Sequence, residues 1–413
     1  MEDTLNHLLT QLLDKEDLGD NRIGLYIFGA GQGGEVLLKY LKENSCITNI
    51  SYDLKGFFDN DTLKHGANID GMTITAPRKD IVASKDFIIV SSVNSYEEIK
   101  RQLLKLGIEE KKILCADDWL AIGNQNIISK YKTELKYIDD NISNTEEKYI
   151  PFLFKEIPIE VFGQLSLQEQ DQYKNIKIFF PLMASEEIQR RWTGSHDSVL
   201  MSQSSAFIKT VVEFCQYQGL QDLNKCNLLD FGCGWGRLIR LLYKYIPANQ
   251  IYGVDAWKVS LDVCNEHQVK GNFAQIKDIC TSIPFDVDFD LVISFSVFTH
   301  LSPRAGIAAL NTIRRYIKNN GILALTVRPI EYWQIHKKLI DSTISIDELI
   351  QTHNKNGVAF VPHNLPPVDG DITFGDITIS LDYIKDHWKQ WKLIEYITNK
   401  EDPYQMILFF KPS

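Results

Sequence analysis

The decamer NLLDFGCGWG, from Asn227 to Gly236, runs from an apolar β segment through a glycine loop and directly into the helical pattern RLIRLLYKYI. The loop reads acid-x-Gly-x-Gly-x-Gly, with Asp230 at its first position. Glycines there let the backbone turn sharply and approach a ligand without a Cβ in the way. The loop lacks the GK[ST] ending of a phosphate-cradling loop, and its acid suits a cationic or amine-bearing ligand better than a pyrophosphate. The stretch therefore predicts a strand–loop–helix unit that binds a small molecule.

Two more acids follow the next two predicted strands. Asp255 ends the strand in IYGVDAW, and Asp278 follows the short strand in NFAQIKD. A carboxylate at the tip of the second strand can accept hydrogen bonds from both ribose hydroxyls. An acid after the third strand is placed to accept from an adenine amino group. The three acids together predict a nucleoside cradle with an amino-acid end.

Outward from this motif, residues 185–413 alternate strands and helices, which predicts a parallel sheet. LIEYIT and QMILFFK, near the C-terminus, predict an antiparallel pair at its edge. The helix SPRAGIAALNTIRRYI is expected to stop at Asn320–Gly321. The Gly- and Pro-rich stretch 353–371, which begins at His353 and contains His363, is read as a loop that either closes over a substrate or is an ordinary surface loop.

A second glycine loop lies near the N-terminus. GAGQGG follows the strand GLYIF and precedes a helix, and Asp59 lies 25 residues beyond Gly34, near the offset expected for a ribose-binding acid. This segment reads β-α-β-β-β-α-β after a helix in the first 20 residues. The candidate nucleotide-binding residues are Gly29, Gly31, Gly34 and Asp59.

The predicted fold class is α/β, with two Rossmann-like doubly wound domains joined by a mainly helical linker. The domains are expected at 1–120 and 185–413. The linker, 121–184, is polar and charged with few glycines.

The C-terminal region, roughly residues 185–413, resembles class I S-adenosylmethionine-dependent methyltransferases. More narrowly, FDLVISFSVFTHLSP (289–303) is similar to the subgroup whose fourth strand runs into SVFTHL, as are the lead-in EEIQRRWTGSHD and the ending DITISLDYIKDHW. The resemblance implies a methyltransferase with S-adenosylmethionine as cofactor. Trp235 departs from the small residues often found inside this loop. By matching positions, the implied cofactor-binding residues are Asp230, Gly232, Gly234 and Gly236 for the methionine portion, Asp255 for the ribose, Asp278 and Ile279 beside the adenine, and Phe295 at the end of the fourth strand.

His300 is the predicted catalytic residue. It follows the fourth strand, where an acceptor would meet the cofactor's methyl group. A hydroxyl acceptor gains from a general base, and an imidazole titrating near neutrality can serve. The alternative is that His300 caps the next helix or pins the loop through a backbone bond.

The N-terminal segment, roughly 22–118, resembles the small Rossmann-like domain at the front of bacterial sugar acetyltransferases. That resemblance implies a sugar or nucleotide-sugar substrate, and O-methylation of a sugar hydroxyl in surface-polysaccharide or nucleotide-sugar metabolism. Two alternatives stay open: an NAD-dependent sugar oxidoreductase or epimerase that uses the N-terminal domain, and a noncatalytic Rossmann scaffold.

Composition argues against several functional classes of protein. The 413 residues carry a net charge of −10, opposite to a nonspecific nucleic-acid binder. There is no apolar run long enough for a membrane span and no signal-peptide pattern. None of the seven cysteines has zinc-ligand spacing, so no metal is expected, and scattered thiols favour a reducing cytoplasm. The N-terminal helix and the linker could support a homo-oligomer.

Overall fold

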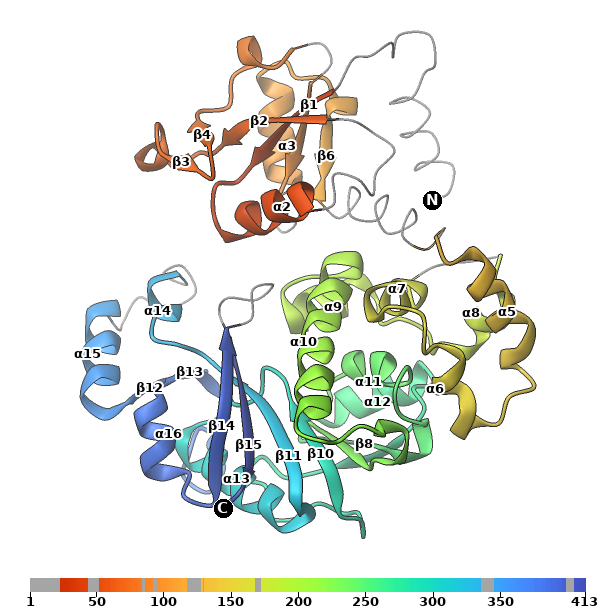
Figure 1. Cartoon of the computed structure of the whole chain (residues 1–413). Coiled ribbons are helices and arrows are strands. Elements are labelled where there is room, and N and C mark those ends of the chain that lie inside the picture. Colours follow the sequence, from red (N-terminus) through yellow and green to blue (C-terminus); the bar gives the residue numbers. More distant parts are fainter. Residues whose placement is uncertain are drawn as a thin grey trace. The chain divides into compact units, whose positions relative to one another are not determined.

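The computed structural model describes residues 23–43, 52–83, 86–91, 96–116, 128, 130–167, 172–335, 345–398 and 405–413 (Figure 1). The helix expected in the first 20 residues lies outside these ranges. The chain divides into two compact units, one of residues 1–133 and 185–201 and the other of residues 134–184 and 202–413. This division differs from the predicted three parts, because most of the expected linker joins the C-terminal unit.

The N-terminal unit contains a six-stranded sheet in the order β3-β4-β2-β1-β5-β6. All strand pairs in it are parallel except β3–β4. Apolar side chains alternate between its faces, so Leu25 and Ile27 pack with α2 while Phe28 packs with α3. The predicted strand and helix order is confirmed, with short β3 added at the expected turn. The elements are β1 (Ile23–Phe28), α2 (Gln32–Glu43), β2 (Tyr52–Phe58), β3 (Asn68–Ile69), β4 (Met72–Thr75), β5 (Asp86–Val90), α3 (Tyr96–Lys105), β6 (Ile113–Cys115) and α9 (Glu186–Thr193).

The stretch expected as a linker forms four helices: α5 (Lys132–Ile142), α6 (Ile150–Leu153), α7 (Ile159–Leu165) and α8 (Lys174–Phe179). Phe154 and Phe162 pack edge to face, with ring centroids 4.8 Å apart. The buried Lys244 ammonium donates to the Phe154 carbonyl at 2.5 Å, and the fully buried Arg240 donates to the Pro181 carbonyl at 2.8 Å. Apolar side chains of this stretch are thus buried, and contacts with α11 (Arg237–Leu242) and the residues beside it hold the stretch on the C-terminal unit.

The C-terminal unit contains a seven-stranded sheet in the order β14-β15-β11-β10-β7-β8-β9. The five strands from β11 to β9 are parallel, and β15 and β14 add antiparallel strands, as predicted (Figure 1). All four residues of β7 are buried. The sheet strands are β7 (Leu228–Phe231), β8 (Ile251–Asp255), β9 (Asn272–Gln275), β10 (Phe289–Ser294), β11 (Ile317–Val327), β14 (Trp391–Thr398) and β15 (Met406–Pro412). The remaining helices are α10 (Asp197–Tyr217), α12 (Lys258–Glu266), α13 (Pro303–Tyr316), α14 (Tyr332–Ile335), α15 (Ile346–Asn356) and α16 (Leu381–His387).

Two local predictions in this unit are wrong. Helix α13 ends at Tyr316, and β11 already begins at Ile317, so Gly321 lies inside a strand. A Cβ on Gly321 would come within 2.6 Å of the Ile317 side chain, so this glycine serves close packing and does not stop a helix. The expected loop 353–371 contains β12 (Val358–Pro362), which pairs antiparallel with β13 (Gly375–Ile379) in a separate two-stranded sheet.

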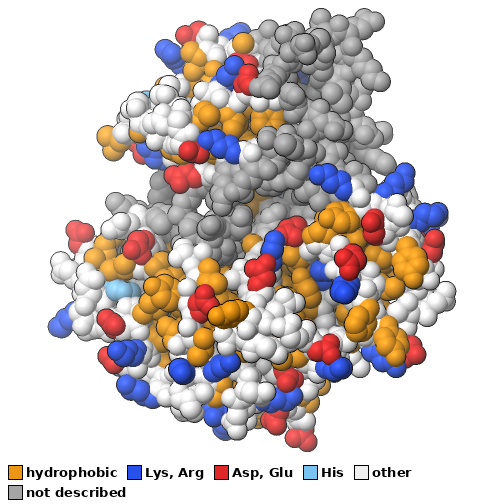
Figure 2. Space-filling view, viewed as in Figure 1, with side chains coloured by type: hydrophobic (Ala, Val, Ile, Leu, Met, Phe, Trp, Pro, Cys, Tyr) orange, Lys and Arg blue, Asp and Glu red, His pale blue; other side chains and the backbone are white. Residues whose placement is uncertain are grey.

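Among the described residues, no helix has both the length and the apolarity to cross a membrane. On the face drawn in Figure 2, acidic and basic side chains of the C-terminal unit are interspersed. That face therefore offers no single-sign surface of the kind that binds a phosphate backbone.

Candidate active site

The glycine loop leaves β7 at the carboxyl edge of the sheet. The Gly232 and Cys233 amides both donate to the Val254 carbonyl of β8, at 2.8 and 3.1 Å. Gly232, Gly234 and Gly236 all have positive φ, at 81°, 54° and 77°. Their surroundings differ, because a Cβ on Gly232 would lie 2.3 Å from Val297, whereas a Cβ on Gly234 would meet no atom within 4 Å. Gly232 therefore permits close packing, and Gly234 borders open space that a ligand can fill.

Asp230, the third residue of β7, is 1% exposed. Its Oδ2 is buried and has no hydrogen-bond partner among the described residues. Burial raises the pKa of Asp230 to about 7, although the nearby Arg237 guanidinium acts in the opposite direction. A buried carboxylate with an open acceptor atom is costly unless a cationic or donor group completes it. Asp230 therefore fits the amine-bearing ligand that the sequence predicts.

Asp255 ends β8 and holds the glycine loop in place. Its Oδ2 accepts the Gly234 amide at 2.9 Å, and its Oδ1 accepts the Trp257 amide at 2.8 Å. Burial raises the pKa of Asp255, and these two amides partly offset that shift. A carboxylate has about four acceptor positions, so both oxygens keep capacity for ribose hydroxyls.

The other predicted cofactor residues, Asp278, Ile279 and Phe295, make fewer polar contacts in the structure. Asp278 is exposed and lies beyond the end of β9, and Ile279 is half-buried. Phe295 directly follows β10, and its ring packs edge to face on Phe207 of α10 at 4.6 Å. The Arg237 guanidinium lies over the Phe295 ring at 4.9 Å. Phe295 is thus tied to the same arginine that faces Asp230.

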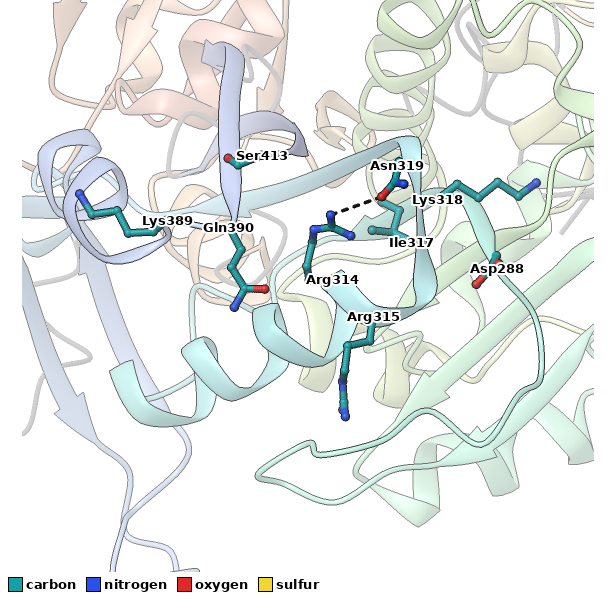
Figure 3. A pocket seen from close by; sticks show the side chains of 9 residues that line it. All are labelled: Asp288, Arg314, Arg315, Ile317, Lys318, Asn319, Lys389, Gln390 and Ser413. Atoms are coloured by element: carbon teal, nitrogen blue, oxygen red, sulfur yellow. Dashed lines mark hydrogen bonds between the residues drawn. The ribbon is translucent and has the colours of Figure 1, made fainter.

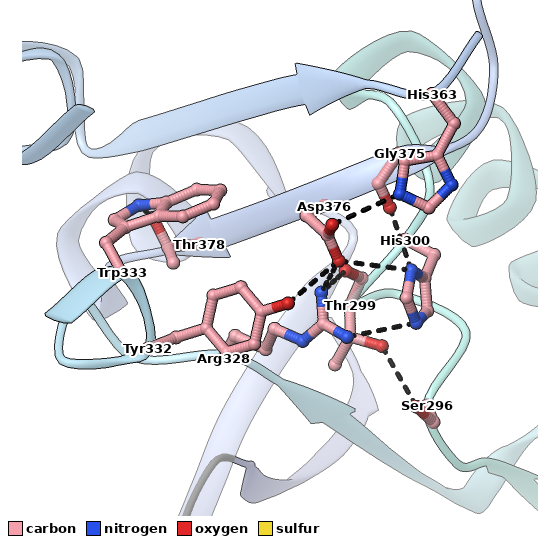
Figure 4. Close-up of polar contacts among 10 residues, drawn as sticks. All are labelled: Ser296, Thr299, His300, Arg328, Tyr332, Trp333, His363, Gly375, Asp376 and Thr378. Carbon is pink, nitrogen blue, oxygen red and sulfur yellow. Dashed lines mark hydrogen bonds and ion pairs between the residues drawn. The ribbon is translucent and has the colours of Figure 1, made fainter. Parts of the chain in front are cut away.

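His300 lies in a dense polar cluster at the carboxyl edge of β10 and β11 (Figure 4). Its Nδ1 is 2.8 Å from the Gly375 carbonyl, and its Nε2 is 3.0 Å from the Arg328 guanidinium. Nδ1 therefore carries the proton, and Nε2 accepts from the arginine. Burial, and then the Arg328 charge, lower the pKa of His300 to about 3. These contacts favour the loop-pinning role over the base.

Arg328 and Asp376 complete this cluster, and sequence reasoning did not identify either. The Arg328 guanidinium donates to the Thr299 carbonyl at 3.0 Å and pairs with Asp376 Oδ1. The Tyr332 hydroxyl donates to the same Oδ1 at 3.0 Å. Burial alone would raise the pKa of Asp376, but the Arg328 charge and the hydrogen bond from His363 hold it below its usual value. An Arg directly after a buried strand, in LTVRP, was the signal available in the sequence.

The two histidines of the predicted loop, His353 and His363, have different environments. His353 is buried on α15, and its Nδ1 is 2.8 Å from the Thr378 hydroxyl. His363 directly follows β12, its side chain is 42% exposed, and its Nε2 lies 3.1 Å from Asp376 Oδ2. His353 is therefore structural, and His363 is the accessible member of the polar cluster.

In the N-terminal unit, Asp59 also holds its glycine loop in place. Asp59 Oδ2 accepts the Ala30 amide at 2.7 Å and the Lys64 ammonium at 3.2 Å, and Oδ1 accepts the Asp61 amide at 2.8 Å. A Cβ on Gly34 would lie 1.9 Å from the Gly29 carbonyl oxygen, whereas Gly31 borders open space. Asp59 thus fixes the loop and pairs with a lysine, and nucleotide binding by this unit stays a prediction.

A depression of about 670 Å³ lies away from these sites (Figure 3). Its lining includes Arg314, Arg315 and Lys318, at the end of α13 and the start of β11. Ligands of open α/β sheets bind outside the carboxyl ends of the strands, and this depression lies at the amino end of β11. We therefore place the candidate site at the glycine loop.

Comparison with known proteins bears on this site. Residues 229–325 match the sequence model of the family described as "Methyltransferase domain". The chain thus contains a segment that matches a methyltransferase domain. The matched segment runs from β7 through β11 and so includes the glycine loop, Asp255 and His300. The match supports a methyltransferase activity for the C-terminal unit.

Solved structures with a similar fold include an S-adenosylmethionine-dependent methyltransferase from Clostridium acetobutylicum ATCC 824, at 12% identity and a TM-score of 0.37, over 55% of this chain and 96% of that one. Another is a magnesium protoporphyrin IX methyltransferase from Synechocystis PCC 6803 with bound SAH, at 13% identity and a TM-score of 0.35, over 65% of this chain and all of that one. No curated protein matches the chain. Residues 22–114 match the family "C2185-like, N-terminal", and the resemblance of this segment to sugar acetyltransferases stays a prediction.

The site fits S-adenosylmethionine, the cofactor that the sequence resemblance implies, in two independent ways. The unpartnered Asp230 Oδ2 suits the cationic amino-acid portion, and the open space beside Gly234 leaves room for it. When bound, the cofactor supplies the methyl group. The chain's own residues hold the loop open through Asp255 and keep Asp230 away from water.

Proposed function

We propose that this methyltransferase transfers its methyl group to a sugar hydroxyl, in a nucleotide sugar or a surface polysaccharide. The observation that carries the proposal is the charge-compensated polar cluster of His300, Arg328, Tyr332, His363 and Asp376 (Figure 4). Within it, Arg328 and Asp376 neutralise each other. Such a surface suits an uncharged, hydroxyl-rich acceptor better than an anion or a cation.

The cluster borders the cofactor loop through a short connection. Strand β10 lies between β7 and β11 in the sheet, so the ends of β7 and β11 are about 10 Å apart. Val297, in the loop after β10, contacts the glycine loop at Gly232 and also accepts the backbone amide of His300. An acceptor on this cluster would therefore approach the methyl-donor side of the site.

An aromatic face adds to the polar groups. The Phe374 ring is 40% exposed and stacks on the His300 ring, with centroids 4.9 Å apart and an interplanar angle of 9°. Aromatic rings supply apolar contact area with little loss of side-chain entropy. The combination of one aromatic face with carboxylate and imidazole acceptors supports recognition of a sugar ring.

The cofactor contacts belong to the same proposal. Asp230, Gly232, Gly234 and Gly236 would hold the methionine portion, and Asp255 would accept from the ribose. Asp278, Ile279 and Phe295 would border the adenine end of the site.

The test is mass spectrometry of nucleotide sugars and oligosaccharides after incubation with the full-length protein and isotopically labelled S-adenosylmethionine. A labelled methyl group on a sugar oxygen is the expected result. Methylation of an amine or a carboxylate acceptor only, across a panel that includes all three classes, would overturn the sugar assignment and leave the methyltransferase class intact. Turnover of NAD with the same sugars would favour the oxidoreductase alternative.

A further inference from the structure

His363 and Asp376 form a carboxylate–imidazole pair at the accessible edge of the polar cluster (Figure 4). Resting on the proposed hydroxyl methylation, we infer that His363 is the general base for the acceptor and that His300 is a positioning residue. In this assignment Asp376 orients the His363 ring, Arg328 orients Asp376, and His300 holds Arg328 in place.

The backbone and ring of His363 are both held in place. Its amide donates to the Phe374 carbonyl at 3.0 Å, and its carbonyl accepts the Leu365 amide at 2.8 Å. The ring Nε2 points at Asp376 Oδ2, 3.1 Å away. Because an ionised carboxylate accepts but does not donate, Nε2 carries the proton and Nδ1 keeps its lone pair. Among the residues that the structure describes, Nδ1 has no hydrogen-bond partner, and the side chain is 42% exposed.

His300 cannot take a proton in the same way. Its Nε2 lone pair already faces the Arg328 guanidinium at 3.0 Å, and its Nδ1–H is engaged by the Gly375 carbonyl. A proton on Nε2 would place two positive charges in contact. The backbone of His300 is also held in place, because the Gly375 amide donates to the His300 carbonyl at 2.8 Å.

The groups that face His363 come from several elements. Asp376 lies on β13, Arg328 follows β11, Tyr332 begins α14 and His300 lies in the loop after β10. Asp376 is the charge in direct contact with His363, and Arg328 meets the opposite oxygen of that carboxylate. The Arg328 charge thus keeps Asp376 ionised, and the ionised carboxylate keeps Nδ1 of His363 as the acceptor.

The reaction step balances with these groups alone and the methyl donor. The acceptor oxygen forms a bond to the methyl carbon while the carbon–sulfur bond breaks, and that electron pair stays on sulfur. The hydroxyl proton passes to Nδ1 of His363, which becomes an imidazolium stabilised by Asp376. The proton then leaves to solvent through the exposed side of the ring. No oxidant or further reactant is needed.

Kinetics on the full-length enzyme separate the two histidines. For a sugar acceptor found as above, His363→Gln should lower kcat by about 10²-fold or more and remove the acid limb of the pH–rate profile. The affinity for S-adenosylhomocysteine, measured by calorimetry, should change less than about threefold. His300→Asn should keep that limb and lower Tm. His387→Gln, which removes an exposed histidine on α16, is the matched control and should retain wild-type turnover and pH dependence. A His363→Gln enzyme with wild-type kcat and pH profile, or loss of the acid limb in His300→Asn alone, would overturn the assignment.

A measurement without turnover tests the geometry itself. In ¹⁵N-histidine-labelled protein, His363 should show a protonated Nε2 and an unprotonated Nδ1, and Asp376→Asn should abolish that preference. An Nδ1–H tautomer at His363 in the wild type would overturn the inference whatever the acceptor is. Failure to methylate any hydroxyl acceptor, with the expected tautomer intact, would count against the proposed function instead.

Discussion

Asp230→Asn is expected to stabilise the ligand-free protein above neutral pH. The carboxyl is fully buried, and its pKa is raised from its ordinary value of 3.8 to about 7. The folded protein therefore keeps a proton there over a pH range in which the unfolded chain has lost it. Stability from this group is complete below pH 4 and falls as the pH rises toward 7. Asparagine has nearly the same shape and does not titrate, so it removes that loss.

The size of the effect follows from the shift. Each pH unit over which only the folded carboxyl holds its proton lowers the free energy of unfolding by about 1.4 kcal/mol. Between pH 5 and pH 8 the wild type should therefore lose about 3 kcal/mol relative to Asp230→Asn. At about 2–4 °C per kcal/mol for a unit of this size, the difference in Tm between variant and wild type should widen by roughly 6–12 °C.

Differential scanning calorimetry of the full-length protein at pH 5 and pH 8 measures this directly. The transition that S-adenosylhomocysteine shifts upward identifies the methyltransferase unit, because a ligand stabilises the unit that binds it. If the two Tm curves run parallel between pH 5 and pH 8, the Asp230 carboxyl is ionised or solvated in the folded state and the reasoning fails. The same variant should bind S-adenosylhomocysteine at least tenfold more weakly, since a neutral amide replaces the partner of a cationic amine.

Two further predictions compare pairs of variants. Gly232→Ala should lower the free energy of unfolding by about 2–4 kcal/mol, because its Cβ would overlap Val297 at positive φ. Gly234→Ala should lower it by only about 1 kcal/mol but should weaken S-adenosylhomocysteine binding, and equal effects of both variants on Tm and affinity would contradict the roles assigned to the loop. Asp255→Ala should weaken S-adenosylhomocysteine binding at least tenfold, because the variant loses the acceptor of the Gly234 amide and of the ribose hydroxyls. Asp59→Ala should leave the affinity measured by calorimetry and the stoichiometry of one ligand per chain unchanged. A second binding event that disappears in Asp59→Ala would reveal a second site.

Most of the fold was predictable because each element carries its own periodicity. The buried run at β7, the glycine turn and the helix that follows need only local sequence to be identified. The end of α13 was not, because Ile317–Gly321 reads equally well as the last turn of a helix. Pairing with β10 decides it, since Ile317 lies opposite Phe289 in the parallel register. A tertiary contact overrides local propensity there.

The candidate site was predictable where one motif contains it and not where the fold assembles it. Asp230, Asp255 and the glycines lie at strand ends, so their position follows from the strand assignment. The cluster around Asp376 joins residues that are 13 to 75 positions apart, from His363–Asp376 to His300–Gly375. No local pattern reveals such pairs. His300 was identified by its place after β10. The partners of its two ring nitrogens are Arg328, which follows β11, and Gly375, which begins β13.

The two glycine loops of this chain share the pattern Phe-Gly-x-Gly and differ at the position that precedes it. Aligned on Phe-Gly-x-Gly, Phe28–Gly31 matches Phe231–Gly234, and each loop donates an amide to the acid at the end of the next strand. That shared contact fixes the turn, so it says nothing about the ligand. The position that precedes the phenylalanine is Ile27 in one loop and Asp230 in the other; Ile27 completes an apolar core, whereas Asp230 leaves a buried oxygen without a partner. The acid that we propose as the partner of a cationic cofactor is therefore replaced by an apolar residue in the N-terminal loop, and we predict that only the C-terminal loop is a methyl-donor site.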